Sequence, residues 1–196
     1  MKMPEQPTCY IVAGPNGAGK TTFALQYLPK IVSCNNFINA DEIAKGVSPL
    51  DFEAGLLQAS KIFLQSLSEK LKSKETFAFE TTLSGRTYLT QIPQWQKAGW
   101  KVVLIYLYIP SAEFSAFRVQ QRFAQGGHNV PADAIVRRYP RSIKNLFLYS
   151  DVCDQTFCFN NEQGLTTSVF ERIKGKQLEI FDKVAYARIM EVANNE

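Results

Sequence analysis

The arrangement of hydrophobic and polar residues along the chain predicts short buried strands that alternate with helices. Apolar runs rich in β-branched and aromatic residues, each bounded by polar residues or glycine, are typical of buried strands. Five segments have this character: Cys9–Ala13, Asn36–Ala40, Thr76–Glu80, Lys101–Ile109 and Gln155–Asn160. Strands that alternate with helices form a parallel sheet covered on both faces. We therefore expect a three-layer α/β fold with a five-stranded, mostly parallel sheet.

The longest helix is predicted between the second and third strands. Ser48 can cap its first turn and Pro49 suits its first helical position. Beyond them, apolar residues recur every three to four positions and define one face of this helix: Leu56, Ala59, Phe63, Leu67 and Leu71.

Prolines divide the other predicted helices, because proline lacks the backbone N–H of the helical hydrogen bond. We expect Pro29 to end the first helix, Pro93 to interrupt the helical part of 86–100, and Pro140 to break or kink a later helix. The expected helices are Thr21–Leu28, part of Arg86–Trp100, Ser111–Arg122, Ala132–Tyr149 and a final one from about Lys183. A C-terminal hairpin and helix are expected over about 165–194, with a turn at Lys174-Gly175.

Length and composition limit the classes of protein. The chain has 196 residues, 45% of them hydrophobic, which suits one domain over residues 1–196. No stretch approaches the roughly 18 apolar residues of a membrane span, and the polar first residues lack a signal-peptide core. Four cysteines without a paired spacing and a single histidine, His128, argue against a zinc site and a disulfide framework. We expect a cytoplasmic protein.

The strongest functional motif follows the first strand. Residues 14–21 read Gly14-Pro15-Asn16-Gly17-Ala18-Gly19-Lys20-Thr21, with Thr22 next, and fit G-x-x-x-x-G-K-[ST] at every fixed position. In such a loop backbone N–H groups surround phosphates, the lysine reaches the β and γ oxygens, and the hydroxyl binds Mg²⁺. The positive end of the following helix adds to the attraction. The motif predicts a site for ATP and Mg²⁺.

Two acids follow predicted strands at the edge of the sheet where ligands of parallel sheets bind. Asp41 follows the second strand, and we expect it to act as the base for the acceptor hydroxyl and to help Thr21 hold the metal. Glu80 ends the third strand and, with Thr81 and Thr82, is expected to bind acceptor hydroxyls. The simpler alternatives are that Asp41 caps a helix and that Glu80 lies in a turn.

Positive charge is concentrated in one segment. The whole chain has a net charge of +4, whereas residues 118–144 hold six basic residues and one acid, a balance of +5. Beside a phosphate loop, the arginines of two helices joined by glycines describe a lid over about 111–149, which would stabilise charge on the transferred phosphoryl group. The arginines in question are Arg118, Arg122 and Arg138, with Arg141 on the same helix as Arg138. His128 is expected to shape the turn between the helices.

The combination of these segments resembles a known family. GPNGAGKTT, NADEIA, FETTLSG and RFAQGGHNVPADAIVRRYPRSIKNL, in this order, are similar to the zeta-toxin-like P-loop kinases over about residues 10–146. The resemblance implies a parallel-sheet kinase core with ATP as donor. It implies that Lys20 and Thr21 serve ATP and Mg²⁺, that Asp41 is the base, and that Glu80 and Thr82 lie near the acceptor. Arg118 and Arg122, and less directly Arg138, would meet phosphates. Some members phosphorylate UDP-N-acetylglucosamine and are held by an antitoxin.

Other functions remain open on the sequence. A different small-molecule kinase on the same fold would have the same motifs. A nucleic-acid-processing protein would use the basic segment as its binding surface. A GTPase would need an NKxD-type segment and an ABC-type ATPase a full signature, and the chain contains neither.

Overall fold

The structure is a computed structural model of the chain and describes residues 6–127, 129–164 and 166–195. Over these residues it has one sheet of seven strands, in the order β2-β3-β1-β4-β5-β6-β7, and seven helices. The strands are β1 (Thr8–Ala13), β2 (Phe37–Ile38), β3 (Phe77–Thr81), β4 (Lys101–Tyr108), β5 (Gln155–Asn160), β6 (Thr167–Ile173) and β7 (Glu179–Ile180). The helices are α1 (Lys20–Ile31), α2 (Ala40–Val47), α3 (Phe52–Ser73), α4 (Thr87–Lys97), α5 (Ala112–Ala124), α6 (Ala132–Val152) and α7 (Lys183–Asn194).

The sheet is larger than the sequence predicts, and it is mixed. Its five predicted strands are present and parallel, but the C-terminal hairpin extends the sheet instead of standing apart. Strand β6 pairs antiparallel with β5, and β7 pairs antiparallel with β6. The prediction of a five-stranded, mostly parallel sheet was wrong because β5 would otherwise leave an open edge, which the hairpin covers with backbone hydrogen bonds.

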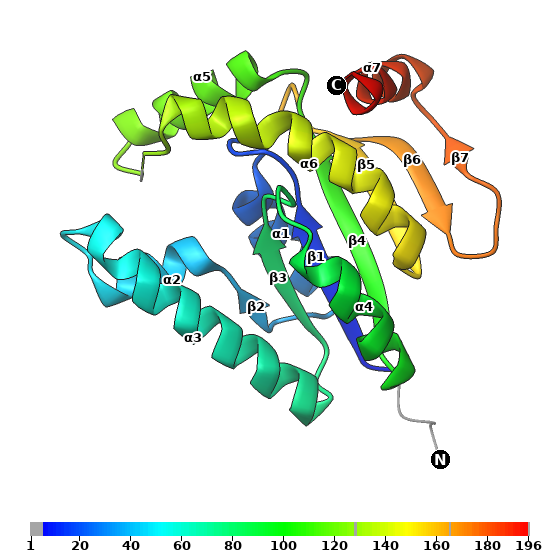
Figure 1. The fold of residues 1–196 in the computed structure, drawn as a ribbon, viewed down its shortest axis with the longest axis horizontal. Coiled ribbons are helices and arrows are strands. Elements are labelled where there is room, and N and C mark those ends of the chain that lie inside the picture. Colours follow the sequence, from blue (N-terminus) through cyan, green and yellow to red (C-terminus); the bar gives the residue numbers. More distant parts are fainter. Residues whose placement is uncertain (1–5, 128, 165, 196) are drawn as a thin grey trace.

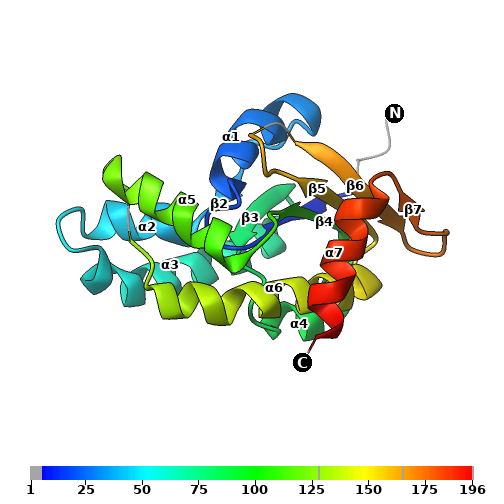
Figure 2. The ribbon, with the colours of Figure 1, turned by 90° about the horizontal axis from the view of Figure 1, so that it is seen from above.

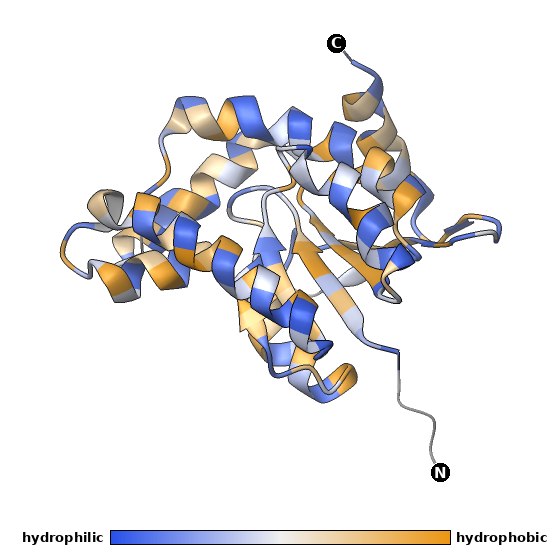
Figure 3. Ribbon diagram, turned by 60° about the horizontal axis from the view of Figure 1, so that its bottom comes forward, coloured by the Kyte–Doolittle hydropathy of each residue, from blue (hydrophilic) through white to orange (hydrophobic). Residues whose placement is uncertain are grey.

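Helices cover the two faces of the sheet unequally. Helix α1 lies on one face, whereas α3, α4 and α6 lie on the other (Figures 1 and 2). Aromatic contacts agree with this arrangement, since Phe79 of β3 contacts Phe63 of α3 and Trp95 of α4. The strands are largely hydrophobic, and the helices alternate hydrophobic and hydrophilic bands (Figure 3). The sheet therefore holds the main core, and the helices bury one side each.

The three internal prolines do not end the helices. Pro29, Pro93 and Pro140 lie inside α1, α4 and α6, which continue past them. Each proline removes one helical hydrogen bond, but tertiary packing supplies most of the stability of a helix in a folded domain. In α4, buried Ile92 and Trp95 lie on either side of the proline. Burial of the residues on both sides of the proline outweighs the loss of one helical hydrogen bond.

Two helix starts also differ from the sequence prediction. Strand β2 has two residues because Asn39 already caps α2. The long helix α3 begins after Asp51, whose side chain accepts a hydrogen bond from the Ala54 backbone N–H, rather than at Pro49.

The predicted lid has two structurally different parts. Helix α5 and the start of α6 share a small apolar cluster of their own, formed by Val119, Val130, Ala134 and Ile135. From Tyr139 onward α6 belongs to the main core. The basic segment thus begins in a separate cluster and ends in the body of the domain.

Gly14 joins β1 to the phosphate loop at a point where no side chain fits. Its φ is +144°, and a Cβ atom there would lie 2.3 Å from the Leu107 carbonyl oxygen. We expect Gly14→Ala to lower the free energy of unfolding by about 3 kcal/mol or more, because strain and overlap with backbone add.

Gly99→Ala is the matched control in urea denaturation. Gly99 also has positive φ, +91°, but its Cβ position is open. Gly99→Ala should lower the free energy of unfolding by only about 1–2 kcal/mol, roughly the cost of the left-handed backbone alone. Equal losses in the two variants would contradict the close approach at Gly14.

Candidate active site

The phosphate loop lies between β1 and α1 and is held in shape by two other parts of the chain. It follows β1, and Gly19, with φ +84°, precedes Lys20 at the start of α1. The Ser115 hydroxyl of α5 donates to the Asn16 carbonyl at 2.5 Å, and the Asn161 amide after β5 donates to the Ala18 carbonyl at 2.8 Å. With the loop's own carbonyls engaged in this way, its N–H groups remain oriented for an anion.

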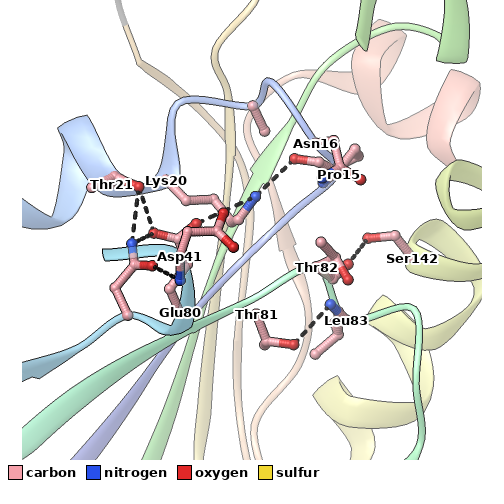
Figure 4. Close-up of polar contacts among 12 residues, drawn as sticks. Pro15, Asn16, Lys20, Thr21, Asp41, Glu80, Thr81, Thr82, Leu83 and Ser142 are labelled. Carbon is pink, nitrogen blue, oxygen red and sulfur yellow. Dashed lines mark hydrogen bonds and ion pairs between the residues drawn. The ribbon is translucent and has the colours of Figure 1, made fainter. Parts of the chain in front are cut away.

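Glu80 lies at the centre of a buried polar cluster beneath this loop. Its side chain is 12% exposed. Carboxylate oxygen Oε2 accepts hydrogen bonds from the Thr21 hydroxyl at 2.7 Å and from the Asn39 amide at 2.8 Å. Lys20 Nζ lies 3.7 Å from Oε1 and donates to the Pro15 carbonyl at 2.9 Å (Figure 4). Glu80 thus contacts both chemically active residues of the loop.

Lys20 shows the electrostatic balance of the cluster. Burial lowers its pKa most, and Glu80 and then Asp41 oppose that shift, while Arg122 adds to it. These shifts mean that two acids and an arginine are close to the Lys20 ammonium. A bound anion would add favourable charge where the lysine now lacks water.

Asn39 is a site residue that the sequence analysis missed. Its side-chain oxygen accepts from the backbone N–H groups of Asp41 and Glu42, which makes it the N-cap of α2. Its amide group donates to Glu80 and, at 3.2 Å, to the Thr21 hydroxyl. A signal for the cap was present, since Asn39 and Glu42 have the spacing of a capping box. The contacts with Thr21 and Glu80 left no sequence signal.

Asp41 is not the cap of α2 but lies in its first turn. It is half-buried and lines a cavity of about 250 Å³ together with Glu80, Thr81, Thr82 and other residues. A second cavity, of about 320 Å³, is lined by the phosphate loop, Glu80 and the lid. Because both cavities share Glu80, the structure brings the predicted acceptor residues next to the phosphate loop.

The loop after β3 is fixed by helix α6. Leu83 is buried with φ +58°, an unusual conformation for a bulky residue, and its N–H donates to the Thr81 hydroxyl at 3.1 Å. The Ser142 hydroxyl donates to the Thr82 carbonyl at 2.6 Å, and the Asn145 amide donates to the Leu83 carbonyl at 2.8 Å. These two helix residues position the loop, and sequence reasoning did not identify them.

The lid arginines occupy different positions. Arg118 and Arg122 both line the cavity of about 320 Å³ beside the phosphate loop. Arg118 donates to the Glu162 carbonyl at 2.9 Å and to the Gly17 carbonyl at 3.5 Å, and burial lowers its pKa. Arg138 is half-exposed on α6 and is not among the residues lining that cavity. His128 lies outside the described residues.

The residues present fit a magnesium ion. Mg²⁺ prefers oxygen ligands and is usually bound by one or two protein groups together with substrate phosphates and water. The Thr21 hydroxyl and the Glu80 carboxylate, 2.7 Å apart, offer such a pair. Within the described residues no group of three or more histidines, cysteines or acids could hold a metal by itself.

The described cysteines, all buried, are free thiols: Cys9, Cys34, Cys153 and Cys158.

Comparison with known proteins identifies the fold. A chain of the AvrRxo1-ORF1:ORF2 complex crystallised with ATP has a TM-score of 0.74 at 17% identity, over 94% of this chain and 63% of that one. A chain of the PezAT chromosomal toxin-antitoxin system of Streptococcus pneumoniae has a TM-score of 0.62 at 16% identity, over 99% and 90% of the two chains. The fold resembles that of P-loop kinases. The chain spans less than two thirds of the AvrRxo1 complex chain.

Sequence comparison adds one relative. An uncharacterised protein of Haemophilus influenzae is 28% identical over 128 residues, which are 64% of this chain and 88% of that protein. No protein-family model matches the chain. Among the helices that the structure describes, none has both the length and the apolar character needed to cross a membrane.

The double role of Asn39 can be separated by substitution. Asn39→Ala removes both the helix cap and the amide donors, and we expect it to lower the free energy of unfolding by about 2–3 kcal/mol. Asn39→Ser retains a capping oxygen and loses only the donors to Glu80 and Thr21, so the loss should be about 1–2 kcal/mol. Urea denaturation measures both. A serine variant as stable as the wild type would show that the amide contacts contribute nothing to stability.

Proposed function

We propose that the protein is an ATP- and Mg²⁺-dependent kinase that transfers the γ-phosphoryl group to a hydroxyl of a small metabolite. The observation that carries this proposal is the contact of Glu80 with the Thr21 hydroxyl at 2.7 Å and with Lys20 at 3.7 Å, beneath a complete phosphate loop. This arrangement joins a metal-binding hydroxyl, a carboxylate and a phosphate-binding lysine. The P-loop kinase-like fold supports it.

The donor side is assigned to the larger of the two cavities that share Glu80. Residues 14–22 would bind the triphosphate, with Lys20 turning from the Pro15 carbonyl to the phosphate oxygens. Thr21 and Glu80 would hold Mg²⁺, which neutralises phosphate charge when it is bound. On the sequence alone Asp41 was expected to hold the metal together with Thr21, but the contact of Glu80 with Thr21 supports Glu80 instead. Arg118 and Arg122 would stabilise charge on the transferred group.

The acceptor side is assigned to the cavity that contains Asp41. Asp41 would orient the acceptor hydroxyl and accept its proton, while Thr81 and Thr82 would form its walls. Helix α5 and the start of α6, with their separate apolar cluster, support the assignment of a lid within a single kinase domain. Arg138 lies one turn before Ser142 on α6 and is proposed to meet the phosphates from the lid.

The resemblance to zeta-toxin-like kinases makes UDP-N-acetylglucosamine one candidate acceptor and an antitoxin a candidate partner. The likeness to chains from the PezAT and AvrRxo1 complexes supports testing a protein partner. A cytoplasmic location fits the free thiols of the described cysteines and a need for ATP.

The function is tested by incubating the protein with Mg·ATP and a panel of hydroxyl compounds that includes UDP-N-acetylglucosamine. Mass spectrometry would detect the added phosphate, and calorimetry would measure nucleotide binding.

Lys20→Ala should remain folded and lose most turnover. Equal Mg·ATP binding and equal turnover in the wild type and this variant would reject the site.

Asp41→Asn should separate chemistry from nucleotide binding. The asparagine cannot accept a proton, so transfer should fall by roughly 10²–10⁴ while ATP affinity is retained. The control is Glu42→Gln, the next residue, whose exposed carboxylate pairs with Lys45 at 2.8 Å. Unchanged transfer in Asp41→Asn would exclude Asp41 as the base. Loss of Mg·ATP binding with no specific loss of transfer would make it a metal ligand.

Arg122→Ala should reduce turnover by roughly 10² or more and affect nucleotide affinity less, because the charge on the phosphoryl group is greatest in transit. Arg137→Ala is the matched control on the lid, since Arg137 is 53% exposed and pairs with Asp133 at 3.5 Å. Steady-state kinetics and calorimetry give the two quantities. Salt-sensitive oligonucleotide binding that is abolished by Arg122→Ala, with turnover unaffected, would instead assign the segment to nucleic acid.

A further inference from the structure

The acceptor cavity has a composition that limits what it can bind. Its walls include two carboxylates, Asp41 and Glu80, the hydroxyls of Thr81 and Thr82, and two aromatic rings, Phe63 and Tyr88. Taking the proposed kinase function as given, we propose that the acceptor is a small, uncharged, polyhydroxylated compound of monosaccharide size. Phosphorylated sugars and nucleotide-sugars are then poor acceptors.

The charges around the cavity are unfavourable for an anion. Among the described residues that line it there is no lysine or arginine. Lys20 contacts the Glu80 carboxylate and belongs to the phosphate loop, and Arg86, near the loop after β3, donates to Asn145 Oδ1 at 3.1 Å. An anionic acceptor would lie beside the two carboxylates and the triphosphate of ATP, and like charges at short range repel. Hydroxyl groups, in contrast, are the donors that carboxylates accept.

The two aromatic rings that line the cavity, Phe63 and Tyr88, suit the face of a sugar ring, and both lie near the buried ring of Phe79. The ring of Phe63 lies 6.0 Å from that of Phe79, and Phe79 lies 4.9 Å from Tyr88. The negative face of an aromatic ring attracts the polarised C–H groups of a sugar. The Tyr88 hydroxyl is protonated at neutral pH, as in any tyrosine, and can donate to a sugar oxygen; burial raises its pKa further, to about 12.

The size and rigidity of the cavity support the same class. Its volume of about 250 Å³ is below the roughly 300–1,000 Å³ that encloses a drug-sized ligand. Its threonine wall is fixed, since Ser142 holds the Thr82 carbonyl and Leu83 N–H binds the Thr81 hydroxyl. Fixed walls discriminate better than flexible ones because they cannot adjust to a larger ligand. Figure 4 shows both contacts.

The test compares neutral acceptors with their phosphorylated or nucleotide-linked forms, which are both charged and larger. Hexoses, pentoses, hexitols and N-acetylhexosamines are each supplied with Mg·ATP beside their phosphate esters, and N-acetylglucosamine beside UDP-N-acetylglucosamine. We expect kcat/KM for the preferred neutral compound to exceed that of its charged partner by about 100-fold, comparable to a strong steric or charge discrimination. Preference for the charged member, or transfer to no neutral compound, overturns the proposal.

Measuring Mg·ATP binding on the same sample distinguishes failure of the neutral-acceptor proposal from failure of the proposed kinase function. A protein that binds Mg·ATP and phosphorylates only anionic compounds leaves the kinase function standing and rejects the neutral acceptor. A protein that neither binds Mg·ATP nor transfers phosphate rejects the kinase function, and the acceptor class with it.

Two substitutions test the walls directly. Tyr88→Ala should raise KM for the preferred neutral acceptor about tenfold and leave KM for ATP unchanged, whereas Tyr88→Phe keeps the ring and stays within about threefold. Thr82→Lys, which places a cation at the wall, should shift the ratio of kcat/KM values toward the charged partner by about tenfold or more. If Tyr88→Ala fails to fold, the Thr82→Lys variant still tests the charge argument, provided that it is folded itself. Unchanged ratios in Thr82→Lys, or an unchanged acceptor KM in folded Tyr88→Ala, contradict the proposal.

Discussion

Glu80 brings a nearly buried carboxylate to the point where three elements meet, and the geometry of the site depends on how that charge is satisfied. Its partners are Thr21 at the start of α1, Asn39 before α2, and Lys20. A buried charge is tolerated only when hydrogen bonds and an opposite charge replace its water. Satisfying Glu80 therefore fixes the phosphate loop relative to β3 and to the segment that carries Asp41.

Helix α6 provides the second constraint. Ser142 and Asn145 hold the loop after β3, while its first turns share a small apolar cluster with α5. Helix α5 in turn contacts the phosphate loop through Ser115. One helix thus connects the acceptor loop to the lid, and a movement of the lid arginines would be limited by the anchored half of α6.

Several local features oppose stability and are found together at the site. Lys20 is desolvated enough to lower its pKa, and Leu83 has a positive φ. Such features persist where the surrounding structure over-determines them, and they cluster at functional sites. Lys20 lines the cavity at the phosphate loop, and Leu83 follows Thr82, which lines the other cavity, so both features support the proposal that this region is the site of chemistry.

The sequence determined the phosphate loop, the approximate places of the five parallel strands, and the placement of Asp41 just after β2 and of Glu80 in the last residues of β3, because fixed spacing and apolar runs are local signals. It did not reveal that Pro93 and Pro140 lie inside helices, since burial of residues on both sides of each proline decides that outcome. Nor did it reveal that the last hairpin extends the sheet, which depends on the free edge of β5. Asn39 was visible as a cap, but its contact with Glu80 joins residues 41 positions apart. Only the tertiary structure brings such distant groups together, because hydrogen bonds between separate elements leave no periodic trace in the chain.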